Sequence, residues 1–172
     1  MYRDILIQTI RFFFLVFLQV FVVNQMLHYN GVNPYIYPLF ILLLPVNTSY
    51  FLLLSLSFCI GFFVDLLQFT SGIHAAATVL TGFLRIFFLR FSLSKENYEK
   101  NIDPNIKEKG VAWFSIYALI LLFIHHFVLY FLEVFTFSEF FFTFLKAVLS
   151  AFTSVLIIIL IEYLFMPTSK KV

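Results

Sequence analysis

The sequence predicts an all-α, polytopic membrane protein with about six transmembrane helices in one integral membrane domain, residues 1–172. Three observations carry this prediction: the composition, the long apolar runs and the one-sided placement of Lys and Arg. Of the 172 residues, 62% are hydrophobic and only 12% are charged, and the mean hydropathy is +1.00. Soluble domains have about 45–50% apolar and about 25% charged residues. This chain therefore lacks the polar side chains that a water-exposed surface requires.

The first two apolar runs differ in length. An apolar helix of about 20 residues crosses the roughly 30 Å hydrocarbon core, and residues 5–25 form a run of that size. The second run, 35–46, has about 12 residues, which reach only about 18 Å as a helix, and it is interrupted by Pro38 and Pro45. We expect a short span there. A tilted broken helix or a re-entrant segment are the alternatives, because lipid cannot satisfy exposed backbone groups.

Four full-length apolar runs complete the chain: 50–68, 73–91, 111–132 and 140–165. The middle two are separated by a hydrophilic loop, 92–110, in which Asp103-Pro104 is a turn signal. We expect this charged loop to be a solvated connector, with docking of cytoplasmic filament proteins as the alternative.

The basic residues fall on one side of this predicted topology. If the second run crosses, both termini and the charged loop share a side, which then holds Arg3, Arg90, Lys95, Lys100, Lys107, Lys109, Lys170 and Lys171. The opposite loops, near 28–33, 68–72 and 133–139, contain no Lys or Arg. Because cytoplasmic loops collect Lys and Arg, six spans with both ends cytoplasmic are favoured over a re-entrant second run. Aromatic residues near the predicted span ends are expected to be interfacial anchors: Tyr35, Tyr37, Tyr50, Trp113 and Tyr163.

Several functional classes find no support in the sequence. The single cysteine, Cys59, excludes an intrachain disulfide or a cysteine-based metal site. A net charge of +2 without a basic patch is not typical of a nucleic-acid-binding protein. No nucleophile elbow, zinc motif or phosphate-binding glycine loop occurs. His125 and His126 are adjacent, so their rings diverge by about 100° on a helix and do not readily share a metal. We expect no cofactor, no metal and no catalysis.

Polar and small residues recur on one face of two neighbouring helices. Ser57, Gly61 and Asp65 are spaced four apart in the third run. The fourth run has a matching face: His74, Thr78, Thr81, Gly82 and Arg85. Since the link between these runs is short, Asp65 and His74 should interact at the outer end of a helical hairpin. A clasp between two helices is favoured over a binding site, because buried polar residues and small side chains mark helix contacts.

The first and last runs also contain ionisable residues. Gln8, Arg11 and Gln19 share one broad face of the first run. Lys146 lies deep in the last run, on a face with Ser150, Thr153 and Ser154, and needs an acidic partner. Asp65 is the expected partner, ahead of Glu139, which can snorkel outward. Arg11 and Glu162 approach the cytoplasmic end, where solvation at the interface is expected.

The passage from Gly61 to Ala75 resembles the rod shape-determining protein MreD family of bacteria. That family has a Gly-x-x-x-Asp-Leu-Leu helix end, a short glycine-containing turn and a helix that begins near His-Ala. The matching positions here are Gly61, Asp65, Leu66, Gly72, His74 and Ala75. The resemblance covers about fifteen residues, and the span count and basic loop extend it over the chain. The heavy Phe content, 27 residues, and the proline-broken second run depart from the family pattern.

The resemblance implies a non-enzymatic scaffold of the complex that elongates rod-shaped cells. Family members associate with the bitopic protein MreC and, through it, with the MreB filament and the peptidoglycan synthases. Their fold is similar to the substrate-binding subunits of energy-coupling-factor vitamin transporters, with six helices and both ends cytoplasmic. The implied location is the bacterial inner membrane.

A vitamin-binding transporter subunit on that fold is the alternative function. Such subunits are similar to one another in an Ala-x-x-x-Ala surface on the first helix, whereas residues 5–25 here contain no alanine. An intramembrane enzyme that uses His74, His125 or Asp65 ranks third.

Overall fold

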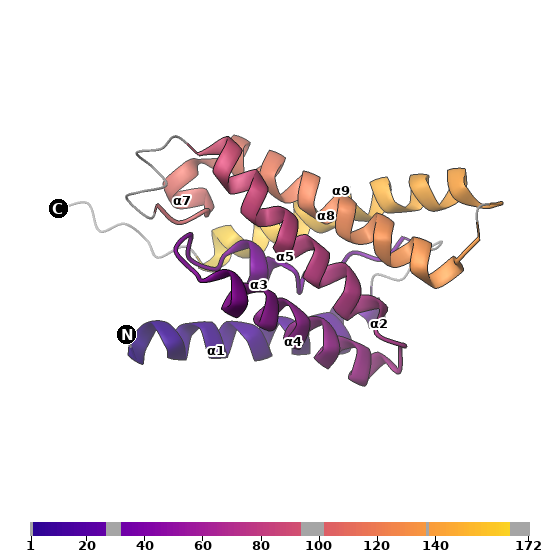
Figure 1. Ribbon diagram of the computed structural model, residues 1–172, viewed down its shortest axis with the longest axis horizontal. Helices are drawn as coiled ribbons and strands as arrows, with labels where there is room; N and C mark the ends of the chain where they lie inside the picture. Colours follow the sequence, from indigo (N-terminus) through magenta and orange to yellow (C-terminus); the bar gives the residue numbers. More distant parts are fainter. Residues whose placement is uncertain (1, 27–31, 94–101, 137, 166–172) are drawn as a thin grey trace.

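The structure of the protein is a computed structural model that describes residues 2–26, 32–93, 102–136 and 138–165. Over these residues all the elements are helical (Figure 1). They are α1 (Tyr2–Phe17), the π-helical η1 (Leu18–Val23), α2 (Asn24–Met26), α3 (Leu39–Leu42), α4 (Tyr50–Gln68), α5 (Ile73–Ser92), α7 (Ile106–Lys109), α8 (Val111–Val134) and α9 (Phe140–Phe165). Lys95, Lys100, Lys170 and Lys171, which contribute to the predicted charge asymmetry, lie outside the described residues.

Two long hairpins and the N-terminal helix build the bundle. Helix α4 packs against α5, α8 packs against α9, and α5 joins the hairpins by packing against α8. Helix α1 lies along α3 and α4. The start of α1, the end of α9 and helix α7 lie at one end of the molecule, and the α4–α5 and α8–α9 turns lie at the other (Figure 1). We call these the terminal end and the hairpin end.

Five of the described helical segments are long and apolar enough to cross a membrane: Ile5–Val23, Tyr50–Gln68, Ile73–Ser92, Val111–Val134 and Phe140–Leu164. Large apolar side chains, among them Phe13, Phe51 and Phe141, are exposed on their outer faces. A surface of this kind matches lipid rather than water. The prediction of a helical, multi-pass membrane protein is confirmed at this level.

Residues 32–46 are mostly not helical, although most are deeply buried. Only α3, four residues long, is helical there; the chain before it is extended and the chain after it forms turns. Ile36, Tyr37 and Ile41 have no exposed surface. Proline at positions 34, 38 and 45 explains the missing helix, because proline has no N–H and disfavours helix in the residue before it.

Side chains of the surrounding helices satisfy the backbone of this segment. The Gln19 side chain accepts a hydrogen bond from the Ile36 N–H (2.6 Å) and donates one to the Pro34 carbonyl (3.1 Å). Tyr117 Oη donates to the Leu42 carbonyl (3.0 Å), and Arg85 donates to the Leu44 carbonyl. Buried backbone groups must be paired, so these contacts permit extended chain inside the bundle.

The same segment runs lengthwise through the bundle. Its first residues lie near the hairpin end, where the Asn33 carbonyl accepts a hydrogen bond from Tyr130 of α8. Its last residues lie near the terminal end, where Arg85 reaches Leu44 and Arg90 reaches Tyr50 at the start of α4. Tyr35 and Tyr37 are consequently buried, and the expectation that they are interfacial anchors is wrong.

Candidate functional site

The hairpin of α4 and α5 contains most of the predicted site residues, and it is packed unusually closely. A Cβ atom placed on Gly61 would lie 2.5 Å from Ala75 Cα and 2.7 Å from the Ala75 nitrogen. One placed on Gly82 would collide with the Ser57 hydroxyl. The small-residue faces of the two helices therefore face each other, as expected for glycine at a helix contact.

Asp65 closes the hairpin at its turn. One carboxylate oxygen accepts hydrogen bonds from the Thr70 hydroxyl (2.5 Å) and the His74 N–H (3.2 Å). The other accepts from the Ala75 N–H (2.8 Å). Two of these three donors, the N–H groups of His74 and Ala75, lie in the first turn of α5, so Asp65 caps that helix from the neighbouring one. The predicted contact between Asp65 and His74 is present, but it goes to the His74 backbone and not to its ring.

The turn itself has two residues with positive φ. Phe69, at φ 57°, ends α4, and Gly72, at φ 85°, precedes α5. Gly72 suits this position because glycine adopts such angles without steric cost. Leu66, one of the positions that carry the family resemblance, points outward and is 54% exposed, whereas Ser57, Gly61 and Asp65 are buried. Ser57, Asp65, His74 and Thr78 are buried inside the hairpin, so they are not a surface that a partner helix could contact.

A second polar cluster lies in the centre of the bundle. Tyr37 Oη is 3.0 Å from His74 Nδ1 and 2.8 Å from His125 Nε2. His125 Nδ1 has no hydrogen-bond partner among the described residues. Because His125 Nδ1 has no acceptor among them, its ring proton is best placed on Nε2, which then donates to Tyr37, and Tyr37 donates to His74 Nδ1. Sequence reasoning missed Tyr37 because it treated the tyrosines of this segment as interfacial.

His126 and Arg85 are held by other groups. His126 Nδ1 lies 2.7 Å from the Leu122 carbonyl, and Nε2 lies 3.2 Å from Ser154 Oγ. The two adjacent histidines therefore have separate partners. Arg85 is buried, and its Nε donates to Tyr117 Oη (3.0 Å). Within the described residues, no group of three or more His, Cys, Asp or Glu side chains is placed to hold a metal ion.

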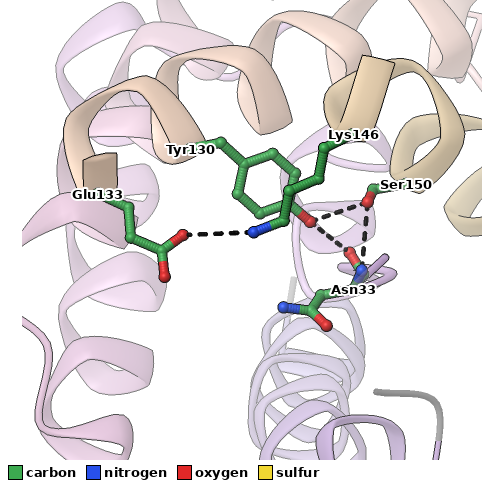
Figure 2. Close-up of polar contacts among 5 residues, drawn as sticks. All are labelled: Asn33, Tyr130, Glu133, Lys146 and Ser150. Carbon is green, nitrogen blue, oxygen red and sulfur yellow. Dashed lines mark hydrogen bonds and ion pairs between the residues drawn. The ribbon is translucent and has the colours of Figure 1, made fainter. Parts of the chain in front are cut away.

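A third cluster joins α8, α9 and the start of the extended segment (Figure 2). Lys146 Nζ lies 3.9 Å from Glu133 Oε2 and 4.1 Å from the centre of the Tyr130 ring. Tyr130 Oη donates to Ser150 Oγ (2.8 Å), and Ser150 Oγ accepts from the Asn33 N–H (3.2 Å). Lys146 therefore pairs with Glu133, and the expected partners Asp65 and Glu139 are wrong. Glu133 is one helical turn from Tyr130, which places its carboxylate beside the ammonium group.

The fourth polar region is an open cavity of about 790 Å³ between α1, α3, α9, α7 and the chain that leads into α7. Its charged lining consists of Arg11, Asp103, Lys107, Glu108 and Glu162. Arg11 and Glu162 were expected to be solvated at the interface, and the structure adds that they share this cavity. Arg11 lies near the terminal end and Lys146 near the hairpin end, so these two predicted intramembrane cations do not meet. The pKa of Asp103 is raised above its ordinary value, mainly because the carboxyl group is partly buried and secondly because the Glu108 carboxylate is nearby.

Comparison with known proteins gives no assignment: no protein-family model, no curated protein and no solved structure matches this chain.

Proposed function

We propose that this protein is a non-enzymatic scaffold of a bacterial inner membrane, of the MreD type. It would bind an MreC-like bitopic protein and, through it, connect to an MreB-like filament and to peptidoglycan synthases. The observation that carries the proposal is the closed hairpin from Gly61 to Ala75, where Asp65 accepts three hydrogen bonds from the turn and from the start of α5. These are the positions on which the resemblance to the family depends.

The proposed topology has six crossings, with both termini cytoplasmic. Five crossings are the long apolar helices, and the sixth is the buried segment 32–46. Its contacts near both ends of the bundle support a crossing rather than a return to the side of entry. The Lys and Arg residues that the sequence assigns to the terminal end support the cytoplasmic orientation.

The geometry supports a structural role for the buried histidines. His74, His125 and His126 have at most 2% of their surface exposed, and none of them lines the large cavity. Their hydrogen bonds go to Tyr37, Ser154 and the backbone. The partner's transmembrane helix would consequently bind an outer apolar face of the bundle, while the polar clusters keep the helices that form this face in register.

Affinity recovery of the tagged protein from native membranes in mild detergent, with mass spectrometry of associated proteins, tests the proposal. A bitopic MreC-like protein and wall synthases are expected. Asp65→Ala should reduce their recovery and make cells rounder, because the loosened hairpin displaces the faces around it. Glu139→Ala is the matched control, since this exposed carboxylate at the same end makes none of the clasp contacts. Normal recovery and normal cell shape with Asp65→Ala would refute the role of the clasp.

The cavity favours a second candidate function, a vitamin-type binding subunit of a transporter. Its volume of about 790 Å³ lies within the roughly 300–1,000 Å³ typical of small-molecule sites. Recovery of an ATPase pair with a coupling subunit, or tight binding of a water-soluble vitamin, would support this candidate over the scaffold.

A further inference from the structure

The large cavity combines two chemically different parts. Apolar side chains from three helices line one part, including Ile10 and Phe14 of α1, Leu39 of α3 and Ile161 of α9. The other part is charged and contains both signs: Arg11 and Lys107 against Asp103, Glu108 and Glu162. A cavity with an apolar wall and a charged rim matches an amphiphilic ligand.

Within the described residues the charged groups of the rim form no direct ion pair with one another, although Arg11 lies close enough to Glu162 and Asp103 to interact with them electrostatically. Within the described residues, Arg11 makes one hydrogen bond, to Gln8 Oε1 at 3.3 Å. A guanidinium has five N–H donors, so most of those of Arg11 lack a protein acceptor in the described part of the chain. No carboxylate of the rim forms an ion pair with Arg11 or Lys107 among these residues.

The position of the rim matches the depth of lipid headgroups. Arg11 follows the start of the first membrane segment, Ile5, by about six residues, which is about 9 Å along a helix. Glu162 comes just before the end of the last segment, Leu164. Arg11 therefore lies near the boundary between headgroups and acyl chains, where long basic side chains reach polar groups.

We infer that this cavity binds a zwitterionic aminophospholipid, with its phosphate on Arg11 and Lys107 and its primary ammonium among Asp103, Glu108 and Glu162. The acyl chains would lie against the apolar wall between α1 and α9. A purely anionic headgroup fits less well because acidic groups outnumber basic ones in the rim. A quaternary ammonium fits less well because it has no N–H to donate to carboxylates. This inference does not depend on the scaffold function.

Native mass spectrometry of the full-length protein in detergent tests this, with equal amounts of phosphatidylethanolamine, phosphatidylcholine and phosphatidylglycerol added. We expect preferential retention of phosphatidylethanolamine. Arg11→Gln should lower its apparent affinity about tenfold, as expected for one lost charge-assisted contact. Glu162→Gln should reduce the preference for phosphatidylethanolamine over phosphatidylcholine. Arg90→Gln is the matched control, because this cation at the same end lies over the Tyr50 ring and outside the cavity.

Arg11→Lys, which keeps the charge, guards against misfolding as an explanation and should retain part of the preference. If the three lipids are retained equally and Arg11→Gln changes nothing, the bound lipid surrounds the protein nonspecifically, and the inference is overturned. Competition by free phosphoethanolamine at the same concentration as the lipid would also overturn it, in favour of a soluble zwitterion. A photo-crosslinker at Ile10 in native membranes should give a lipid adduct, and a protein adduct would assign the cavity to a partner helix.

Discussion

At the scale of single residues, the buried polar side chains of this protein mainly satisfy backbone groups. Asp65 accepts hydrogen bonds from two N–H groups at the start of α5. The Gln19 side chain donates to the Pro34 carbonyl and accepts from the Ile36 N–H. Arg85 donates to the Leu44 carbonyl. In a bilayer these groups have no water to replace a lost partner. Each such side chain therefore stabilises a local backbone conformation that apolar sequence alone would not produce.

Replacing Asp65 should destabilise the fold more than its single position suggests. Asp65→Ala leaves the Ala75 N–H and the Thr70 hydroxyl without their acceptor, and we expect a loss of about 2 kcal/mol in the free energy of unfolding. Reversible unfolding in mixed micelles, followed by circular dichroism, measures the change. Asp65→Asn keeps one acceptor oxygen and should lose less. Equal stability of the alanine variant and the natural protein would show that water replaces the carboxylate.

At the scale of elements, small residues set how closely α4 and α5 approach. Gly61 packs against the backbone of Ala75, and Gly82 packs against the Ser57 side chain. A methyl group added at Gly61 would have to displace backbone atoms, whereas one added at Gly82 would have to displace a side chain. Backbone in the first turn of a capped helix cannot move without breaking several hydrogen bonds, whereas rotation of the Ser57 hydroxyl disturbs a single bond, to the Leu53 carbonyl.

Alanine at the two glycines should therefore have different effects. Gly61→Ala should destabilise by about 2 kcal/mol, since overpacking against backbone exceeds the gain in helix propensity. Gly82→Ala should be nearly neutral, because a gain of about 1 kcal/mol in propensity offsets the displacement of Ser57. Thermal unfolding of both variants under the same detergent conditions provides the comparison. A larger loss for Gly82→Ala than for Gly61→Ala would contradict this packing order.

At the scale of the whole molecule, the path of the segment 32–46 decides the relative sides of the N-terminus and the loop before α8. With this segment crossing, Tyr2 and Asn105 share a side, and Ser71 lies opposite. If the segment returned to its side of entry, Tyr2 and Asn105 would be separated by the membrane. Tyr2 begins α1 and Asn105 directly precedes α7, and the start of α1 and α7 both lie at the terminal end of the bundle (Figure 1).

Cysteine labelling in intact cells should show this arrangement. With Cys59 replaced by Ser, Ser71→Cys should react with a membrane-impermeant maleimide, whereas Tyr2→Cys and Asn105→Cys should react only after permeabilisation. Cys59 is exposed, so its removal is needed for a clean background. Opposite behaviour of positions 2 and 105 would exclude the crossing, and labelling of both in intact cells would reverse the orientation.

Much of the helical architecture was predictable from the sequence, because hydrophobic length is a local property. The long apolar runs became the long helices, and the spacing of Ser57, Gly61 and Asp65 correctly placed them on one face. The short length and the prolines of the second run already set it apart from the other runs. Its form was not predictable, because extended chain in a membrane depends on partners such as Tyr117 and Gln19, which are distant in sequence.

The site residues were less predictable for the same reason. Lys146 required an acidic partner, but depth along the helices could not distinguish Asp65 from Glu133, which lies on the helix that α9 contacts. Both oxygens of Asp65 already accept hydrogen bonds from its own hairpin. The Tyr37 cluster could not be predicted because it depends on the packing of residues 35–37 against histidines of α5 and α8, which are distant in sequence.

The extended segment also constrains the order of biogenesis. Gln19 precedes this segment in the chain, but other partners of its backbone, Arg85, Tyr117 and Ser154, are synthesised after it. Residues 32–46 leave the ribosome before any of these later side chains exist, and bare carbonyl and amide groups do not partition into lipid. Strict helix-by-helix release into the bilayer is therefore unfavourable for this chain. We expect residues 32–46 to remain in the insertion machinery or at the water interface until the α8–α9 hairpin has been inserted and packs around them.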